Sequence, residues 1–219
     1  PADIKARLAA SWQRHGTRLM AMKAVAIDNY DLATFGWDTP VDDQGDCGSC
    51  HIFSGMGSLD SALLKAHHGT PDKSLLSKQH VMDCANTGDC NGGWPEDTIA
   101  FCKKVGVATL EEYGPYRGRS FNCKSTTSMK LLKVADYGYV GREDGVPTAQ
   151  AIKDSLVKFG AISVAVAADN AFMNYKAGTV FRGNGRGINH AVLLVGWKTE
   201  SKKTIWKMKN SWGTSWGDG

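Results

Sequence analysis

Residues 44–51 of the chain read Gln44-Gly45-Asp46-Cys47-Gly48-Ser49-Cys50-His51. Beyond them, residues 52–65 place apolar side chains at helical intervals, which predicts that Cys50 opens a buried helix. A free thiol has a pKa of about 8.5 and is mostly protonated at neutral pH, whereas the partial positive charge of a helix N-terminus stabilises a thiolate. Cys50 is therefore a candidate nucleophile, although the Cys-x-x-Cys spacing by itself also occurs in redox pairs and zinc sites.

A catalytic thiol needs a basic partner, and the later sequence contains a candidate. His190 heads an apolar, strand-like run 140 residues beyond Cys50. Asn210 follows twenty residues later, in Lys209-Asn210-Ser211-Trp212-Gly213. Taken alone, a histidine on a strand is usually structural and an asparagine in a loop is usually a turn residue. The order cysteine, histidine, asparagine at these separations favours a catalytic set instead.

These three segments resemble the active-site segments of papain-like cysteine peptidases in residue content, order and spacing. The resemblance implies that Cys50 attacks as a thiolate and that His190 holds the proton as imidazolium. Asn210 would orient the imidazole, with Trp212 screening that hydrogen bond from water. Gln44 would join the Cys50 backbone N–H in an oxyanion hole. The implied reaction is peptide-bond hydrolysis through a thioester acyl-enzyme, with polypeptides as substrates.

The resemblance also implies a substrate-binding surface. The stretch from Cys90 to Pro95 is similar to the family's substrate-binding loop, whose glycines let an extended peptide approach, and a plain turn is the alternative. Apolar residues at the positions of the family's main specificity pocket predict an endopeptidase that prefers an apolar P2 residue, the residue preceding the cleaved one by one place. The residues expected to bind substrate are Gly92, Gly93, Trp94, Pro95, Ala165, Ile188, Asn189, Ala191 and Trp212.

Composition narrows the classes of protein that the chain could represent. Its 219 residues can bury one or two cores, and 42% hydrophobic with 22% charged residues indicates a globular protein. No run approaches the roughly 20 apolar residues of a membrane span. A formal charge of +4 with scattered Lys and Arg is too mild to indicate nucleic-acid binding. The peptidase chemistry implied above needs no cofactor or metal, and we expect neither.

The six cysteines leave five if Cys50 is the nucleophile. The resemblance pairs Cys47 with Cys90 and Cys84 with Cys123, as disulfides of the helical part. That leaves Cys102, on a predicted helix, as a buried and inert thiol. Two structural disulfides indicate an oxidising compartment, so we expect a secreted, lysosomal or vacuolar protein.

The expected fold is α+β, with the two-domain arrangement of the papain-like family. Residues 27–133 should form a helical domain that carries the nucleophile, and residues 134–219 a strand-rich, barrel-like domain that carries the histidine and asparagine, with the site in the cleft between them. Residues 1–26 form a basic, helix-favouring extension outside the resemblance. A helix packed on the body, a remnant of a pro-segment and a docking helix for a partner are all open interpretations.

Locally, Ser77 is expected to cap a helix that ends near Cys84, and residues 148–159 to form another helix. Strands are expected over residues 161–166, 191–195 and 204–208, where β-branched and apolar residues cluster.

Several departures from the family keep other functions open. His51 replaces the usual tryptophan after the nucleophile, and should point away from the sulfur because one helical step rotates a side chain by about 100°. Leu32 replaces another tryptophan. The sequence stops at Gly219, where relatives continue into further strands, so a partner chain could complete the sheet. Alternatives are therefore a weak or inactive homologue that binds or supports other proteins, and a transferase or ligase. Pro-segments and cystatin-like inhibitors are possible partners.

Overall fold

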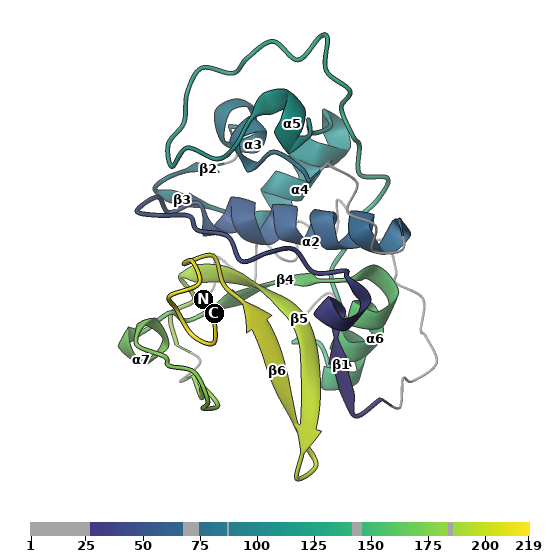
Figure 1. Cartoon of the computed structure of the whole chain (residues 1–219), viewed down its shortest axis with the longest axis vertical. Coiled ribbons are helices and arrows are strands. Elements are labelled where there is room, and N and C mark those ends of the chain that lie inside the picture. The colour runs from purple at the N-terminus through teal and green to yellow at the C-terminus, as the bar shows by residue number, and fades with distance from the viewer. Residues whose placement is uncertain (1–26, 68–74, 87, 142–145, 184–185) are drawn as a thin grey trace.

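The computed structural model describes residues 27–67, 75–86, 88–141, 146–183 and 186–219 (Figure 1). Helices gather on one side of the molecule and a sheet lies on the other, with the long helix α2 (Cys50–Ala66) between them. The predicted extension over residues 1–26 lies outside the described residues. The fold is α+β, as expected. The predicted boundary at residue 133 stays a prediction.

The helical side is built around α2, as the apolar spacing after Cys50 predicted. Its buried residues include Ile52 and Met56, neither of which is exposed at all. They pack with Val81 and Cys102 from two further helices into one hydrophobic cluster. The elements on this side are α3 (Lys78–Cys84), β2 (Gly88–Asp89), β3 (Gly92–Gly93), α4 (Pro95–Lys104) and α5 (Leu110–Tyr113).

The sheet has four antiparallel strands, and β5 (His190–Glu200) is at its centre. Along one side of β5, β4 (Ile162–Val166) pairs with its first half and β1 (Asn29–Asp31) with its second half. Along the other side runs β6 (Lys203–Lys209). Strand β1 therefore brings residues from the predicted helical part into the sheet.

The residues of β5 from 190 to 197 are all buried, so both faces of this part of the strand are covered. Helices α2 and α6 (Ala149–Phe159) both pack against β5. Leu156 of α6 belongs to the second hydrophobic cluster, together with Leu194, Val195 and Trp197 of β5. A strand buried on both faces reads as an unbroken apolar run, which is the pattern that identified it in the sequence.

The remaining predicted helices and strands are present with shifts of about one residue at their ends, except that β5 continues five residues beyond the predicted end at Val195. Ser77 Oγ accepts a hydrogen bond from His80 N, and Thr148 Oγ1 accepts one from Ala151 N, so both residues cap their helices. The departure Leu32 starts a short 3-10 helix, η1 (Leu32–Phe35), and is completely buried. It is a core residue.

Four of the six cysteines form the two expected disulfides, Cys47–Cys90 and Cys84–Cys123. Cys102 is free and completely buried, with its sulfur 3.7 Å from the sulfur of Met56. Burial raises the pKa of the Cys102 thiol to about 12, so this cysteine is inert at physiological pH. Within the described ranges, no helix has the length and apolar character needed to cross a membrane.

Candidate active site

The candidate nucleophile, Cys50, is the first residue of α2 and has a free, partly exposed thiol. Burial raises the pKa of this thiol, while the backbone N–H groups of Ala191, His51 and Cys50 itself act in the opposite direction. The N–H of Ala191 belongs to the residue directly after His190, on the sheet side of the molecule. The sulfur therefore lies at the junction between α2 and the start of β5.

His190 is the first residue of β5, and its ring is held by Asn210. The Nε2 atom of the imidazole lies 2.8 Å from Asn210 Oδ1, which also accepts a hydrogen bond of 2.8 Å from the backbone N–H of Ser211. An atom that accepts from a backbone N–H is an oxygen, so the imidazole donates through Nε2. Its Nδ1 is then the nitrogen left to exchange a proton with a thiol.

Aromatic rings cover the His190–Asn210 hydrogen bond. Trp212 stacks on the imidazole with 4.7 Å between ring centroids and 27° between ring planes, as the resemblance implied. Phe172, in the short helix α7 (Asn170–Met173), contacts the rings of His190 and Trp212 edge-on. Burial lowers the pKa of His190, and the Asn210 hydrogen bond opposes this effect. Exclusion of water strengthens the hydrogen bond that orients the ring.

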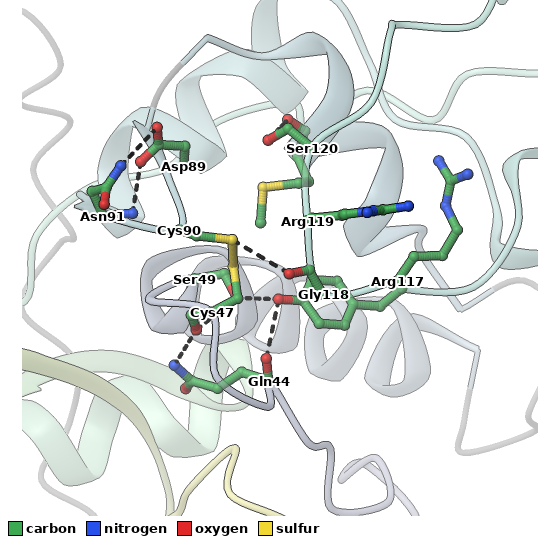
Figure 2. The surroundings of a disulfide bond; sticks show 12 residues. Gln44, Cys47, Ser49, Asp89, Cys90, Asn91, Arg117, Gly118, Arg119 and Ser120 are labelled. Atoms are coloured by element: carbon green, nitrogen blue, oxygen red, sulfur yellow. Dashed lines mark hydrogen bonds between the residues drawn. A yellow bond between two sulfur atoms is a disulfide. The ribbon is translucent and has the colours of Figure 1, made fainter.

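Gln44 lies in the loop before α2, and both ends of its side-chain amide form hydrogen bonds with neighbouring residues. Its Nε2 donates to Cys47 O at 2.8 Å, and its Oε1 accepts from Ser211 Oγ at 2.7 Å. Its backbone N–H donates to Ser211 O at 2.8 Å. An amide nitrogen has two hydrogens, so one remains for a substrate oxygen. Figure 2 shows Gln44 beneath Cys47 and Ser49 at the start of α2.

A buried hydrogen bond sets the spacing between helix and strand at the site. Ser54 Oγ donates to Val192 O at 2.7 Å, and Ser163 Oγ lies 2.6 Å from Ser54 Oγ. Ser54 is four residues after Cys50, on the same face of the helix, and Val192 is two residues after His190 on the same face of the strand. This contact therefore holds the backbones that carry thiol and imidazole at one fixed separation.

The glycine-rich loop lies directly beside the nucleophile loop. The Gly48 N–H donates to Cys90 O at 2.8 Å, next to the Cys47–Cys90 disulfide. A side chain at position 48 would meet Cys90 O at 2.4 Å and Gly92 N at 3.5 Å, so the two backbones touch. Gly92 and Gly93 form the short strand β3, and Trp94 and Pro95 begin α4.

The remaining expected substrate contacts come from the sheet. Ala165 pairs with Ala191 across β4 and β5, so both lie beside His190. Ile188, just before β5, is 48% exposed and available to a ligand. Asn189, which was expected to bind substrate, uses its side chain within the chain: its Oδ1 accepts from Ala168 N at 2.7 Å and its Nδ2 donates to Ala168 O. Its amide therefore ties down the chain after β4.

His51 is completely buried, and its ring lies on the side of the helices. A side chain at Gly88 would come within 2.9 Å of its Cε1, so the ring packs directly on β2. Neither ring nitrogen makes a hydrogen bond of ordinary geometry, although the Asp89 backbone is close enough to act on the ring. Burial lowers the pKa of His51, with the backbone and charge of Asp89 and the charge of Asp97 acting against it.

Sequence reasoning missed three residues that support the site: Ser54, Phe172 and Ser211. Ser211 lies inside the Asn-Ser-Trp-Gly stretch, whose match to the family could have pointed to it. Ser54 and Phe172 reach the site only through the packing of α2 and α7, so no local pattern marks them.

A small cavity lies behind the site, between α2 and the sheet. Its volume of about 10 Å³ has room for a single water molecule, so it is too small to bind substrate. In the part of the chain that the structure describes, no three His, Cys, Asp or Glu side chains are grouped to hold a metal ion.

Comparison with known proteins agrees with this geometry. The family model described as papain family cysteine protease matches residues 27–219. Cathepsin K of Mus musculus is 35% identical over 195 residues, which are 87% of this chain and 57% of the relative. The gamete and mating-type specific protein A of Dictyostelium discoideum is 37% identical over 187 residues, 83% of this chain and 39% of the relative. The chain thus spans about two fifths to three fifths of these relatives.

The fold has solved counterparts as well. The bromelain protease from Ananas comosus, solved in complex with the E64 inhibitor, superimposes with a TM-score of 0.74 at 32% identity. The similarity covers 89% of this chain and 87% of that one. Because the family match, the relatives and the fold agree over the residues that carry Cys50, His190 and Asn210, the chain belongs to the papain family of cysteine proteases.

Proposed function

We propose that the chain is a cysteine endopeptidase with Cys50 as nucleophile and His190 as its acid and base. The observation that carries this proposal is the buried His190–Asn210 pair, which occupies Nε2 of the imidazole and leaves Nδ1 to exchange a proton with the thiol at the N-terminus of α2. Burial disfavours a charge on either partner alone. A thiolate and an imidazolium are therefore stable here only together, as one ion pair.

The proposed reaction has two halves. The Cys50 thiolate attacks the peptide carbonyl carbon, and the oxygen becomes an oxyanion bound by the Gln44 amide and the Cys50 N–H. The carbon–nitrogen bond then breaks as the His190 imidazolium gives its proton to the leaving amine, which leaves a thioester. In the second half His190 takes a proton from water, the hydroxide attacks the thioester, and the acid leaves as the ion pair is restored.

The decisive test is labelling by a peptidyl epoxide or vinyl sulfone, read by mass spectrometry. The chain has a matched control, because Cys50 and Cys102 are both free thiols and only Cys50 is accessible. Cys50→Ala should abolish labelling and hydrolysis, whereas Cys102→Ala should preserve both. A folded wild-type chain that takes no label would favour the second candidate, a weak or inactive homologue that serves as a binding or structural component. The burial that raises the pKa of Cys50 is the observation in favour of that candidate.

Substrate preference forms part of the same proposal. Ala165 and Ala191 lie side by side next to the histidine, and Ile188 is exposed beside them in sequence, which supports an apolar residue at P2. Internally quenched peptides blocked at both ends should be cleaved, and a leucine at P2 should be cleaved faster than an arginine. Equal rates for the two peptides would remove the P2 preference, and cleavage of unblocked peptides alone would indicate an exopeptidase.

The disulfides support folding in an oxidising compartment, secreted, lysosomal or vacuolar. Pro-segments and cystatin-like inhibitors are the partners that we propose for the cleft. Thiol titration of the denatured chain, purified without reductant, should find two of the six thiols reactive. Six reactive thiols would contradict the compartment.

A further inference from the structure

The loop that carries the oxyanion donors has a second support besides its disulfide. The hydroxyl of Tyr116 donates to Gln44 O at 3.2 Å and lies 2.6 Å from Ser49 Oγ. A carbonyl oxygen can only accept, so with the Tyr116 proton on Gln44 O the short contact to Ser49 requires the Ser49 hydroxyl to donate to the phenol oxygen, in preference to Cys47 O at 3.5 Å. One phenol oxygen thus joins the two ends of the segment 44–49.

The two ends of this segment matter because each positions one oxyanion donor. Gln44 provides a side-chain amide, and Ser49 directly precedes the Cys50 backbone N–H. The segment between them is neither helix nor strand, and it turns through Gly45 at a φ of 59°. The distance between the two donors therefore depends on bonds that cross the loop, which Figure 2 shows around Gln44, Cys47 and Ser49.

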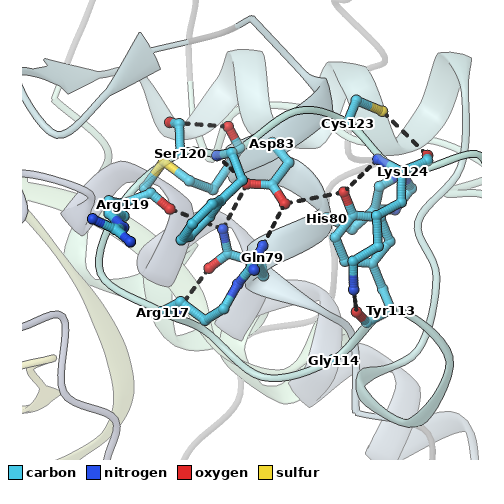
Figure 3. Close-up of polar contacts among 12 residues, drawn as sticks. Gln79, His80, Asp83, Tyr113, Gly114, Arg117, Arg119, Ser120, Cys123 and Lys124 are labelled. Atoms are coloured by element: carbon cyan, nitrogen blue, oxygen red, sulfur yellow. Dashed lines mark hydrogen bonds and ion pairs between the residues drawn. The ribbon is translucent and has the colours of Figure 1, made fainter.

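Tyr116 is itself held by a rigid frame. Its ring packs edge-on against Phe53 of α2, with 4.8 Å between centroids and 82° between planes. The next residue, Arg117, donates its backbone N–H to Gln79 Oε1 at 2.7 Å and its guanidinium to Asp83 Oδ2 at 3.0 Å. The Asp83 side chain is completely buried (Figure 3). The phenol is therefore fixed to α3 on one side and to α2 on the other.

The phenol also stays a donor across the working pH range. Burial raises the pKa of Tyr116 above its ordinary value of 10.0, with the Ser49 hydrogen bond acting against this and the charge of Asp43 adding to it. A hydroxyl that remains protonated keeps its hydrogen bond to Gln44 at any pH at which the peptidase works.

We propose that Tyr116 is a positioning residue for the oxyanion site, whose hydroxyl holds Gln44 and Ser49 at the separation at which the two donors converge on one substrate oxygen. This inference rests on the peptidase function proposed above. Without the hydroxyl, the loop relaxes and both donors shift by a fraction of an ångström. Donors that are misplaced rather than lost should lower kcat by roughly tenfold.

The test compares two reactions of the same thiol in Tyr116→Phe, which keeps the ring on Phe53. Hydrolysis of a peptide amide forms an oxyanion, whereas alkylation by iodoacetamide displaces iodide and forms none. We expect kcat for hydrolysis to fall roughly tenfold with little change in KM. The rate and pH profile of alkylation should stay unchanged, because the thiolate–imidazolium pair is untouched.

Tyr113→Phe is the matched control. The Tyr113 hydroxyl donates to Asp83 at 3.1 Å and has no bond to the nucleophile loop, and Arg117 keeps its own bonds to Gln79 and Asp83 when this hydroxyl is removed (Figure 3). The kcat of this variant should stay close to that of the wild type. If Tyr116→Phe fails to fold, Ser49→Ala provides the test, with a smaller loss of kcat and the same unchanged alkylation.

Three results would overturn the inference: a wild-type kcat in Tyr116→Phe, equal losses of hydrolysis and alkylation, or the same loss in Tyr113→Phe. Each of these would leave the proposed peptidase function standing, because the wild type remains active in all of them. A folded wild-type chain that hydrolyses no peptide would instead overturn the proposed function, and this inference with it.

Discussion

Asp60 makes the free energy of unfolding depend on pH in a direction opposite to that of most carboxylates. It lies in α2, ten residues after Cys50, and is completely buried. Burial raises its pKa from 3.8 to about 6, against the attraction of Lys78 and the hydrogen bond from Leu76 N. The folded protein therefore binds this proton more tightly than the unfolded chain does. Its stabilising effect is complete below 3.8 and is lost as the pH rises through about 6.

The substitution Asp60→Asn removes the titration and keeps the local bond. The backbone N–H of Leu76 donates to Asp60 Oδ1 at 2.9 Å, and an asparagine oxygen can accept the same hydrogen bond. With one pKa unit equal to about 1.4 kcal/mol, wild type should lose about 2 kcal/mol of unfolding free energy between pH of about 4.5 and about 7.5 through this group. The Asp60→Asn variant should lack this loss, so its stability relative to wild type should rise with pH by the same amount.

Urea denaturation followed by circular dichroism at the two pH values measures the difference directly. Lys78 lies 3.8 Å from Asp60 Oδ2 and 3.0 Å from Asp42 Oδ2. Lys78→Met removes the attraction that lowers the pKa of Asp60, so this control should lose more stability over the same range than wild type. Parallel stability profiles of wild type and Asp60→Asn would refute the reasoning, whatever the constant offset between them.

Three further variants, one of them a double substitution, test the packing around the site. His51→Phe removes two buried ring nitrogens that make no hydrogen bond of ordinary geometry, so unfolding free energy should rise by about 1–2 kcal/mol. Because burial lowers the pKa of His51, the wild-type protein loses stability as the pH falls below 6.5. The gain in unfolding free energy of His51→Phe, measured by urea denaturation, should therefore be larger there, and a gain that is the same at every pH would contradict this. Gly57→Ala places a carbon 2.4 Å from Leu193 Cδ1, and should cost about 1–3 kcal/mol in a thermal melt; an unchanged Tm would oppose it. Replacing both Cys47 and Cys90 by serine removes a crosslink between residues 43 apart and should lower the free energy of unfolding by about 2–4 kcal/mol. A loss of peptidase activity under conditions where the double variant stays folded would argue for a role of this disulfide in the site.

The boundaries of the elements followed from local rules, and these rules operate over a few residues. Ser77 and Thr148 cap helices by accepting hydrogen bonds from residues three positions ahead, which a sequence displays directly. The apolar run after His190 is likewise a local signal, because a strand that is buried on both faces has apolar residues at consecutive positions. Strand β1 was not foreseen, because three residues are too few to show a period.

The chain itself determined its family, because that match depends on residue types at spacings that a single sequence shows. The resemblance to the family then supplied the two disulfide pairings and the candidate nucleophile and base. Only the tertiary structure decided how the site is supported. The contacts that join Ser54 to Val192 and Tyr116 to Ser49 span 138 and 67 residues. Hydrophobic periodicity says which face of a helix or strand is buried, but not which distant polar group will meet it there. For that reason the buried ring of His51 and the crossing bond of Tyr116 became visible only once α2 was packed against its neighbours.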